Sequence, residues 1–247
     1  MTYPDNPAGR LYSILHSVIE KGGTDDKIND VLAEVFGIQP DNRLELFNIY
    51  VELLQLVRTS KSAVENLHGV DNDLYIRPFE RLERGFSILS LNNKWLQLRE
   101  YLDDSTLTAL MFCSDTLSNR IGEKSISNKE IAKLQKEVEA LLDTMVTIKL
   151  DDSLRTFLID RLEHIRKAIL YYRIKGADGL KEALENTIGS MYLFRTEKEE
   201  ENHEKDDSAM NKVKKTFIQI IEHLSKLVSF AKDTKELLGG DMPLLGP

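Results

Sequence analysis

The sequence contains a single cysteine, Cys113, among 247 residues, so no disulfide can form within the chain. Its neighbours Leu110, Met111 and Phe112 are apolar and predict a buried thiol. A buried thiol is a poor nucleophile because the reactive thiolate is disfavoured away from water. A chain without disulfides fits a reducing compartment, and we expect a cytoplasmic protein.

Long apolar runs are also missing. The most apolar segment, "FIQIIEHLSKLVSF" at 217–230, is interrupted by Gln219, Glu222, His223 and Lys226. A membrane-spanning helix needs roughly 18 consecutive apolar residues, so the sequence predicts no transmembrane segment. The first residues, "MTYPDNPAGRLYSILHSVIEKGG", lack the basic start and apolar run of a secretory signal.

An excess of positive charge is lacking as well. The formal net charge is −8 at pH 7, and the isoelectric point is about 5.3. Such a chain repels nucleic acid and anionic lipid at long range, so nucleic acid is not a favoured partner. With 41% hydrophobic and 30% charged residues, the composition is that of an ordinary globular protein with a sizeable core.

The common catalytic motifs are absent from the sequence. It has no G-x-x-x-x-G-K-[ST] phosphate loop and no G-x-G-x-x-G dinucleotide motif. No histidine is followed by aspartate, as in metal phosphohydrolases. We therefore predict no catalytic residue and no cofactor, and favour a protein that is not an enzyme.

Two Glu-x-x-His pairs resemble the metal-binding pattern of ferritin-like bundles, in which two further glutamates complete the site. The candidate ligands are Glu34, Glu65, His68, Glu163, Glu200 and His203. A chain this rich in glutamate produces such pairs by chance. His203 also lies among charged residues, which would leave the site in open water, so we predict no metal site.

The first 40 residues predict a helical hairpin. Asn6 followed by Pro7 is a favourable helix start, and Gly22 and Gly23 end the apolar periodicity that follows. Thr24 is the expected cap of a second helix that Gly37 and Pro40 terminate.

Residues 41–69 predict one long helix with apolar positions nearly all round its first half, which we expect to be central and mostly covered. Residues 71–121 look less regular. Pro78 and Gly85 interrupt the pattern, and Ser105 is the expected cap of a further helix.

The second half of the chain has stronger helix signals. Ser127 and Glu130 form a capping box, and Asp151 or Asp152 opens the next helix, which Gly176 closes before another at 178–194. Apolar residues recur at spacings of three and four after Ser127, as in the seam of a bundle or coiled coil. These are Ile131, Leu134, Val138, Leu141, Met145 and Ile148.

The expected organisation is an all-α, multi-helix bundle of about seven to nine helices. The bundle spans 1–194, with a sub-boundary near 122–127, and is followed by an acidic, solvated connector at 195–211. A C-terminal amphipathic helix at 212–238 and a flexible tail at 239–247 complete the chain.

The C-terminal helix is the candidate interaction element. Its apolar stripe contains Phe217, Ile220, Leu224 and Leu227, which are the candidate partner-binding residues. Two interpretations stay open: the stripe completes the protein's own bundle, or the helix binds a partner, nucleic acid or an anionic membrane surface. Lysines on the same helix are consistent with both interpretations. They are Lys212, Lys214, Lys215, Lys226, Lys232 and Lys235.

Two stretches resemble segments of bacterial all-helical proteins: "NPAGRLYSIL" at 6–15 and "LRTFLIDRLEHIRKAILYYRIKGADGLKEALENTIGS" at 154–190. The distinguishing residues are Tyr172-Arg173-Ile174 before Gly176, and Gly179-Leu180 opening the next helix. The resemblance implies a bacterial, helical, cytosolic protein. No activity is attached to these segments, so it implies no site.

These observations favour a non-enzymatic helical interaction or regulatory protein of a bacterial cytosol, in a stress or phage-defence system, with a protein partner or self-association. One alternative is a metal- or nucleotide-dependent helical enzyme with carboxylates from separate helices. The other is a membrane-surface effector acting through residues 212–247.

Overall fold

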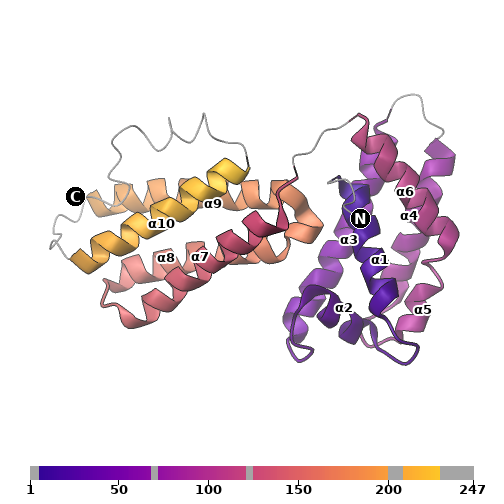
Figure 1. Ribbon diagram of the computed structural model, residues 1–247, viewed down its shortest axis with the longest axis horizontal. Helices are drawn as coiled ribbons and strands as arrows, with labels where there is room; N and C mark the ends of the chain where they lie inside the picture. The colour runs from indigo at the N-terminus through magenta and orange to yellow at the C-terminus, as the bar shows by residue number, and fades with distance from the viewer. Residues whose placement is uncertain (1–5, 68–71, 121–124, 200–207, 229–247) are drawn as a thin grey trace. The chain divides into compact units, whose positions relative to one another are not determined.

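The computed structural model describes residues 6–67, 72–120, 125–199 and 208–228 (Figure 1). These residues contain ten α-helices and no strand, apart from an isolated antiparallel bridge between Lys27 and Lys94. The all-α, multi-helix prediction is confirmed. The count exceeds the expected seven to nine because the region after residue 71 forms three helices where we expected less regular structure.

The helices gather into two compact units, which are described separately. The first comprises residues up to Ser125 together with Arg173–Gly176, and the second comprises Ile126–Tyr172 and the chain from Ala177 onward. The helices of the first unit are α1 (Pro7–Lys21), α2 (Ile28–Phe36), α3 (Arg43–Glu65), α4 (Asn72–Ile88), α5 (Trp95–Arg99) and α6 (Asp104–Ser118). The other four are α7 (Asn128–Thr147), α8 (Asp152–Leu170), α9 (Tyr172–Glu199) and α10 (Ser208–Leu227).

Helix α1 organises the first unit by packing against α6 and α3, while α3 also packs against α4. The predicted cap is confirmed, since the Asn6 side chain accepts a hydrogen bond from the Gly9 amide at 2.9 Å. The same side chain donates to the Ser114 carbonyl (3.0 Å) and the Ser118 hydroxyl (2.7 Å) on α6. One buried asparagine therefore both starts α1 and joins it to α6.

The start of α2 differs from the prediction. Its N-cap residue is Lys27 instead of Thr24, and Lys27 makes no side-chain capping bond. The first amides of α2 instead donate to carbonyls of the segment before α5, from Ile28 to Asn93 and from Asn29 to Leu91, both at 3.0 Å. A distant segment thus replaces the local cap. At its other end α2 stops at Gly37, as predicted, in the left-handed conformation that glycine adopts readily.

Helix α4 continues through both Pro78 and Gly85, where we predicted interruptions. A proline inside a helix removes one backbone hydrogen bond and crowds the preceding turn. The buried side chains Phe79, Leu82 and Phe86 recur on one face of α4 and offset this cost by packing in the core. Apolar burial therefore outweighs the local helix-breaking signal.

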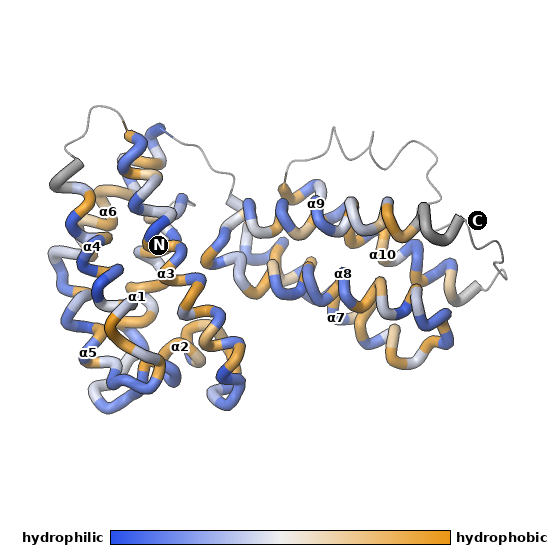
Figure 2. Tube along the Cα trace, turned by 180° about the vertical axis from the view of Figure 1, so that it is seen from behind, coloured by the Kyte–Doolittle hydropathy of each residue, from blue (hydrophilic) through white to orange (hydrophobic). Residues whose placement is uncertain are grey.

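The second unit has its own apolar core, to which α7, α8, α9 and α10 all contribute. The capping box of Ser127 and Glu130 is present, and Asp151 caps α8, as predicted. Figure 2 shows apolar residues recurring along these helices. The hydroxyl of Tyr172 accepts from the Ile126 amide at 3.0 Å and reaches the Ile126 carbonyl at 3.2 Å, which holds the chain entering α7.

After residue 194 the structure describes two helical segments. Helix α9 extends to Glu199, within the stretch expected to be a connector, and α10 runs from Ser208 to Leu227, within the ranges expected for the connector and the C-terminal helix. Glutamate and lysine are good helix formers, so a polar extension of α9 is physically favourable. Residues 200–207, the end of the expected C-terminal helix at 229–238 and the expected tail at 239–247 lie outside the described residues.

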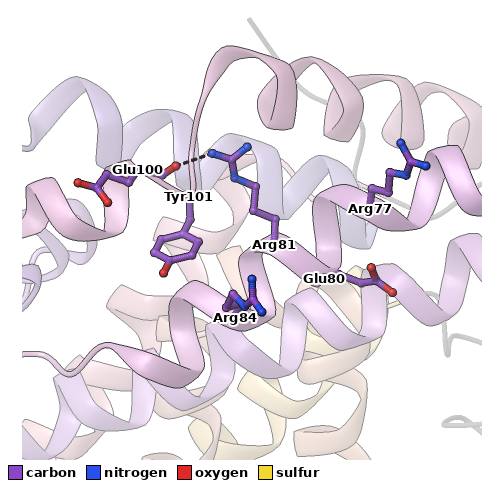
Figure 3. A pocket seen from close by; sticks show the side chains of 6 residues that line it. All are labelled: Arg77, Glu80, Arg81, Arg84, Glu100 and Tyr101. Carbon is purple, nitrogen blue, oxygen red and sulfur yellow. Dashed lines mark hydrogen bonds between the residues drawn. The ribbon is translucent and has the colours of Figure 1, made fainter.

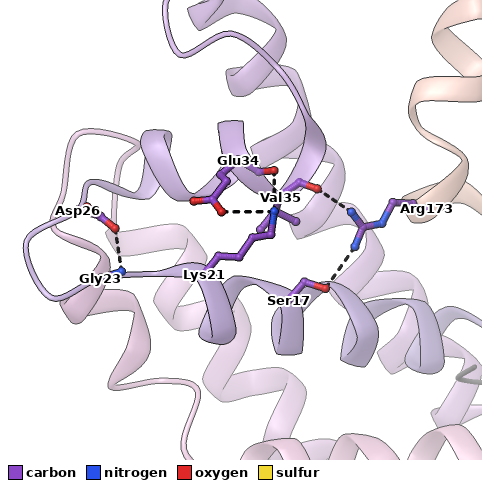
Figure 4. Close-up of polar contacts among 7 residues, drawn as sticks. All are labelled: Ser17, Lys21, Gly23, Asp26, Glu34, Val35 and Arg173. Atoms are coloured by element: carbon purple, nitrogen blue, oxygen red, sulfur yellow. Dashed lines mark hydrogen bonds and ion pairs between the residues drawn. The ribbon is translucent and has the colours of Figure 1, made fainter. Parts of the chain in front are cut away.

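A short segment at the start of α9, Arg173–Gly176, belongs to the first unit (Figure 4). The Arg173 guanidinium donates to the Val35 carbonyl at 2.7 Å and lies 5.4 Å from the centre of the Phe36 ring. Burial lowers the pKa of Arg173 from its usual value. Gly176 has φ 62° and ψ −154°, a conformation almost restricted to glycine, so it kinks α9 where we expected a helix end.

Gly22 provides a test of the packing around α5. The buried Trp95 ring lies so close to Gly22 that a Cβ atom there would overlap it. We expect Gly22→Ala to lower the free energy of unfolding by about 1–3 kcal/mol, as overpacking of a core does. Trp95 is the only tryptophan, so its fluorescence during chemical denaturation reports on the first unit.

Gly189→Ala is the matched control. Gly189 lies inside α9, and beyond the backbone of its own helix and its chain neighbours nothing would lie within 4 Å of an added Cβ. Alanine there should raise the free energy of unfolding by about 0.5–1 kcal/mol, because it favours the helix more than glycine does. Circular dichroism measures this change. Equal stability of Gly22→Ala and the wild type would contradict the packing argument.

Candidate functional site

Of the six residues considered as metal ligands, three lie in the described part of the chain, and none of these three is part of an acidic or histidine cluster there. Glu34 pairs with Lys21 at 3.5 Å (Figure 4), Glu163 pairs with Arg166 at 2.7 Å, and Glu65 is exposed at the end of α3. His68, Glu200 and His203 lie outside the described residues. In the described part of the chain, no group of three or more histidine, cysteine or acidic side chains could hold a metal ion.

Cys113 is fully buried, and its thiol lies 3.6 Å from the Tyr75 carbonyl. Burial raises the pKa of this thiol to about 12, so it stays protonated at neutral pH. A protonated, buried thiol is neither a nucleophile nor a ready metal ligand.

The candidate partner-binding residues of the C-terminal helix lie in the core of the second unit. Phe217, Ile220, Leu224 and Leu227 are at most 7% exposed and pack among apolar side chains of the same unit. Of the two interpretations left open, the structure thus places this stripe in the protein's own bundle. The four side chains are covered within this bundle, and their role in binding a partner stays a prediction.

Polar contacts strengthen the packing of α10 on α7. His223 Nδ1 lies 2.6 Å from Glu137 Oε2, and both side chains are partly buried. On the same helix Lys214 is buried, while Lys212, Lys215 and Lys226 are exposed. Lys232 and Lys235 lie outside the described residues. None of the described helices is long and apolar enough to cross a membrane.

An exposed apolar stripe lies on α3 instead. Leu44, Phe47 and Val51 are 74%, 56% and 48% exposed, and they follow one another at spacings of three and four on one side of the helix. The opposite side of α3 is buried through residues such as Ile49, and Tyr50 donates its hydroxyl hydrogen toward carbonyls of Phe86 and Leu89 at 2.8 and 2.9 Å. The expectation that the first half of this helix is mostly covered therefore does not extend to the stripe of Leu44, Phe47 and Val51.

A pocket of about 720 Å³ lies along another face of the first unit (Figure 3). Helix α4 supplies three arginines at spacings of four and three, which places them on one side of the helix. The chain at the end of α5 forms the facing wall. The lining residues are Arg77, Glu80, Arg81, Arg84, Glu100 and Tyr101.

Arg81 is held in place by the chain between α5 and α6. Its Nη2 donates to the Glu100 carbonyl at 2.6 Å, and its Nη1 pairs with Asp103 Oδ2 at 2.6 Å. Asp103, and not Ser105 as predicted, is the N-cap of α6, and its side chain accepts from the Thr106 amide at 2.9 Å. The same carboxylate therefore starts α6 and fixes an arginine of the pocket.

Hydrogen bonding lowers the pKa of Asp103 to about 2. The largest contribution comes from the Thr106 hydroxyl at 2.7 Å, followed by the Thr106 amide, the Ser105 hydroxyl and the charge of Arg81, while burial acts in the opposite direction. The group is therefore ionised at neutral pH and keeps its bonds to Arg81 and α6.

Gly85 allows Tyr101 to approach α4 closely. A Cβ atom at Gly85 would lie 2.9 Å from Tyr101 Cγ, which is closer than real Cβ contacts. Figure 3 shows the Tyr101 ring beside Arg81 and Arg84. The glycine that looked like a helix breaker in the sequence instead makes room for the aromatic wall of the pocket.

Comparisons with models of protein families, with curated proteins and with solved structures find no match to this chain. Its function must therefore be inferred from its own surfaces.

The sequence analysis predicted neither the exposed stripe on α3 nor the pocket on α4, although the sequence contains part of the pattern for each. The spacings of Leu44, Phe47 and Val51 and of the α4 arginines are helical. Nothing in the sequence shows which apolar face of α3 stays exposed, or that Glu100 and Tyr101 lie against α4. Those facts depend on contacts between segments that are distant in the chain.

The lowered pKa of Asp103 predicts a pH-dependent contribution to stability. The charged carboxylate stabilises the fold above about pH 4, and this contribution is lost as the pH falls toward 2. Asp103→Asn keeps a capping side chain but removes the charge. We expect it to lower the free energy of unfolding at pH 7 by no more than about 1 kcal/mol, because the pair with Arg81 is partly exposed.

Denaturation followed by Trp95 fluorescence measures the free energy of unfolding of Asp103→Asn and of the wild type. The difference between the two values should shrink steadily from pH 4 to pH 2. Asp104→Asn is the matched control, since the neighbouring Asp104 is exposed and has no hydrogen-bond partner in the described residues. We expect Asp104→Asn to lower the free energy of unfolding at pH 7 by less than Asp103→Asn does. A difference for Asp103→Asn that is independent of pH would contradict this account.

Proposed function

We propose that this chain is a non-enzymatic helical interaction protein that binds an amphipathic helix of another protein on α3. We place it in a bacterial cytosol in a regulatory role, such as a stress or phage-defence system. The observation that carries the proposal is the exposure of Leu44, Phe47 and Val51 on a helix whose opposite face is already buried. Large apolar side chains that stay in water on one continuous stripe are typical of interaction surfaces.

The spacing of the stripe suits a helical partner. Positions 44, 47 and 51 follow the three-four pattern by which one helix receives the side chains of another. Leu54 continues the same pattern and is partly buried. A partner helix with apolar residues at matching spacings would cover the stripe over about two turns.

The size of the stripe favours a transient partner over a permanent dimer. Three such side chains present on the order of a few hundred Å² of apolar surface. A stable interface buries roughly 800 Å² on each partner, so this stripe alone is too small for an obligate assembly. A regulatory contact that forms and dissociates is consistent with that size.

Phe47 supplies the central test. We expect Phe47→Glu to weaken partner binding by at least about tenfold, because it places a charge in the middle of an apolar contact. A photo-crosslinking amino acid at position 47 in the source cell, followed by mass spectrometry, identifies the partner. Titration of the purified partner with the wild type and the variant then measures the affinity.

Val146→Glu is the matched control, since Val146 is an exposed apolar residue on α7, outside the stripe on α3. It should leave the affinity unchanged. Failure to crosslink any protein through position 47, or equal affinities of Phe47→Glu and the wild type, would refute the proposal. A wild-type dimer in sedimentation that Phe47→Glu dissociates would show self-association instead.

A further inference from the structure

We propose that the α4 pocket binds an acidic segment of a protein through Arg77 and Arg84. This inference rests on the proposed function in one respect, namely that the acidic segment belongs to a protein partner. The pocket lies on α4 and the α5–α6 connection, so its residues are separate from the stripe on α3.

Two of the three arginines are free to accept a ligand. Both hydrogen-bonding ends of the Arg81 guanidinium are engaged by Glu100 and Asp103. Arg77 and Arg84 are exposed, and neither has an ion pair in the part of the chain that the structure describes. A guanidinium is always charged at physiological pH and can bind a carboxylate through two parallel hydrogen bonds.

The positions of the two arginines define the spacing of the ligand's charges. Arg77 and Arg84 are two turns apart on α4, which corresponds to about 10 Å along the helix axis. A single anion cannot lie beside both guanidiniums unless both side chains bend toward it. A segment with several carboxylates can instead contact both arginines at once.

The remaining charges of the pocket favour carboxylates over a nucleic-acid backbone. Glu80 and Glu100 lie in the same lining, and Lys61 partly offsets Glu80 across 3.9 Å. The whole chain carries a net charge of −8. A continuous polyphosphate would meet these acids at close range, whereas a peptide can place its carboxylates selectively opposite the arginines.

Tyr101 adds a contact that suits a peptide. Its ring lies against α4 at Gly85, beside Arg84, and offers an apolar face and a hydroxyl (Figure 3). A peptide can place a side-chain stem on the ring while its carboxylates bind the arginines. The pocket therefore combines charge recognition with a small apolar platform.

The test uses the purified full chain and a fluorescein-labelled glutamate-rich peptide, with fluorescence anisotropy at low ionic strength. We expect Arg77→Ala and Arg84→Ala each to raise the Kd by about two- to fivefold, the range typical of exposed ion pairs. Glu100→Gln should lower the Kd, because it removes a repelling charge. Added salt should weaken binding to the wild type.

Three controls make the outcome specific. Arg166→Ala removes an exposed arginine from α8 and should leave the Kd unchanged. A peptide with glutamine in place of glutamate should not bind. Phe47→Glu should bind the acidic peptide like the wild type, so failure of this inference is distinguishable from failure of the α3 proposal.

Two results would overturn the inference. The first is a Kd for the acidic peptide that neither Arg77→Ala nor Arg84→Ala changes, because binding would then lie elsewhere. The second is tighter binding of a single-stranded oligonucleotide of equal charge that is lost in the same two variants. That result would assign the pocket to nucleic acid.

Discussion

The burial of apolar helix faces against one another is the interaction on which both units of this protein depend. Isolated helices of these lengths are marginal in water, so each helix is stabilised chiefly by the neighbour that covers its apolar stripe. In the second unit α10 completes this arrangement with Phe217 and Leu224. In the first, α1 is covered by α3 and α6. Any apolar stripe left uncovered after this pairing is therefore informative.

Helix α3 carries more apolar surface than its own unit covers. Its inner face packs against α1 and α4, whereas Leu44, Phe47 and Val51 remain in water. An exposed stripe costs solubility and contributes nothing to the stability of the unit, so its presence needs a reason outside the fold. The described part of α10, Ser208–Leu227, has no comparable exposed stripe. We therefore base the interaction proposal on α3.

The arginine pocket is built from residues that also serve the fold. Asp103 starts α6 and pairs with Arg81, and Gly85 admits Tyr101 against α4. These contacts order one wall of the pocket before any ligand binds, which reduces the entropy lost on binding. Arg77 and Arg84 remain available on the same side of the helix.

Local signals in the sequence were sufficient for helical class and for several helix ends. The Asn6 cap, the Ser127 capping box and the stop at Gly37 all depend on residues within a few positions of one another. Such interactions are encoded in short segments, so periodicity and capping patterns reveal them.

Other features depend on contacts between distant segments, which no short pattern contains. The α2 amides bind carbonyls of Leu91 and Asn93, so the local cap at Thr24 is not used. Core packing carries α4 through Pro78. The apolar stripe of α10 is buried and that of α3 stays exposed because different helices pack beside each of them. These neighbours come from distant parts of the sequence and are brought together only by folding.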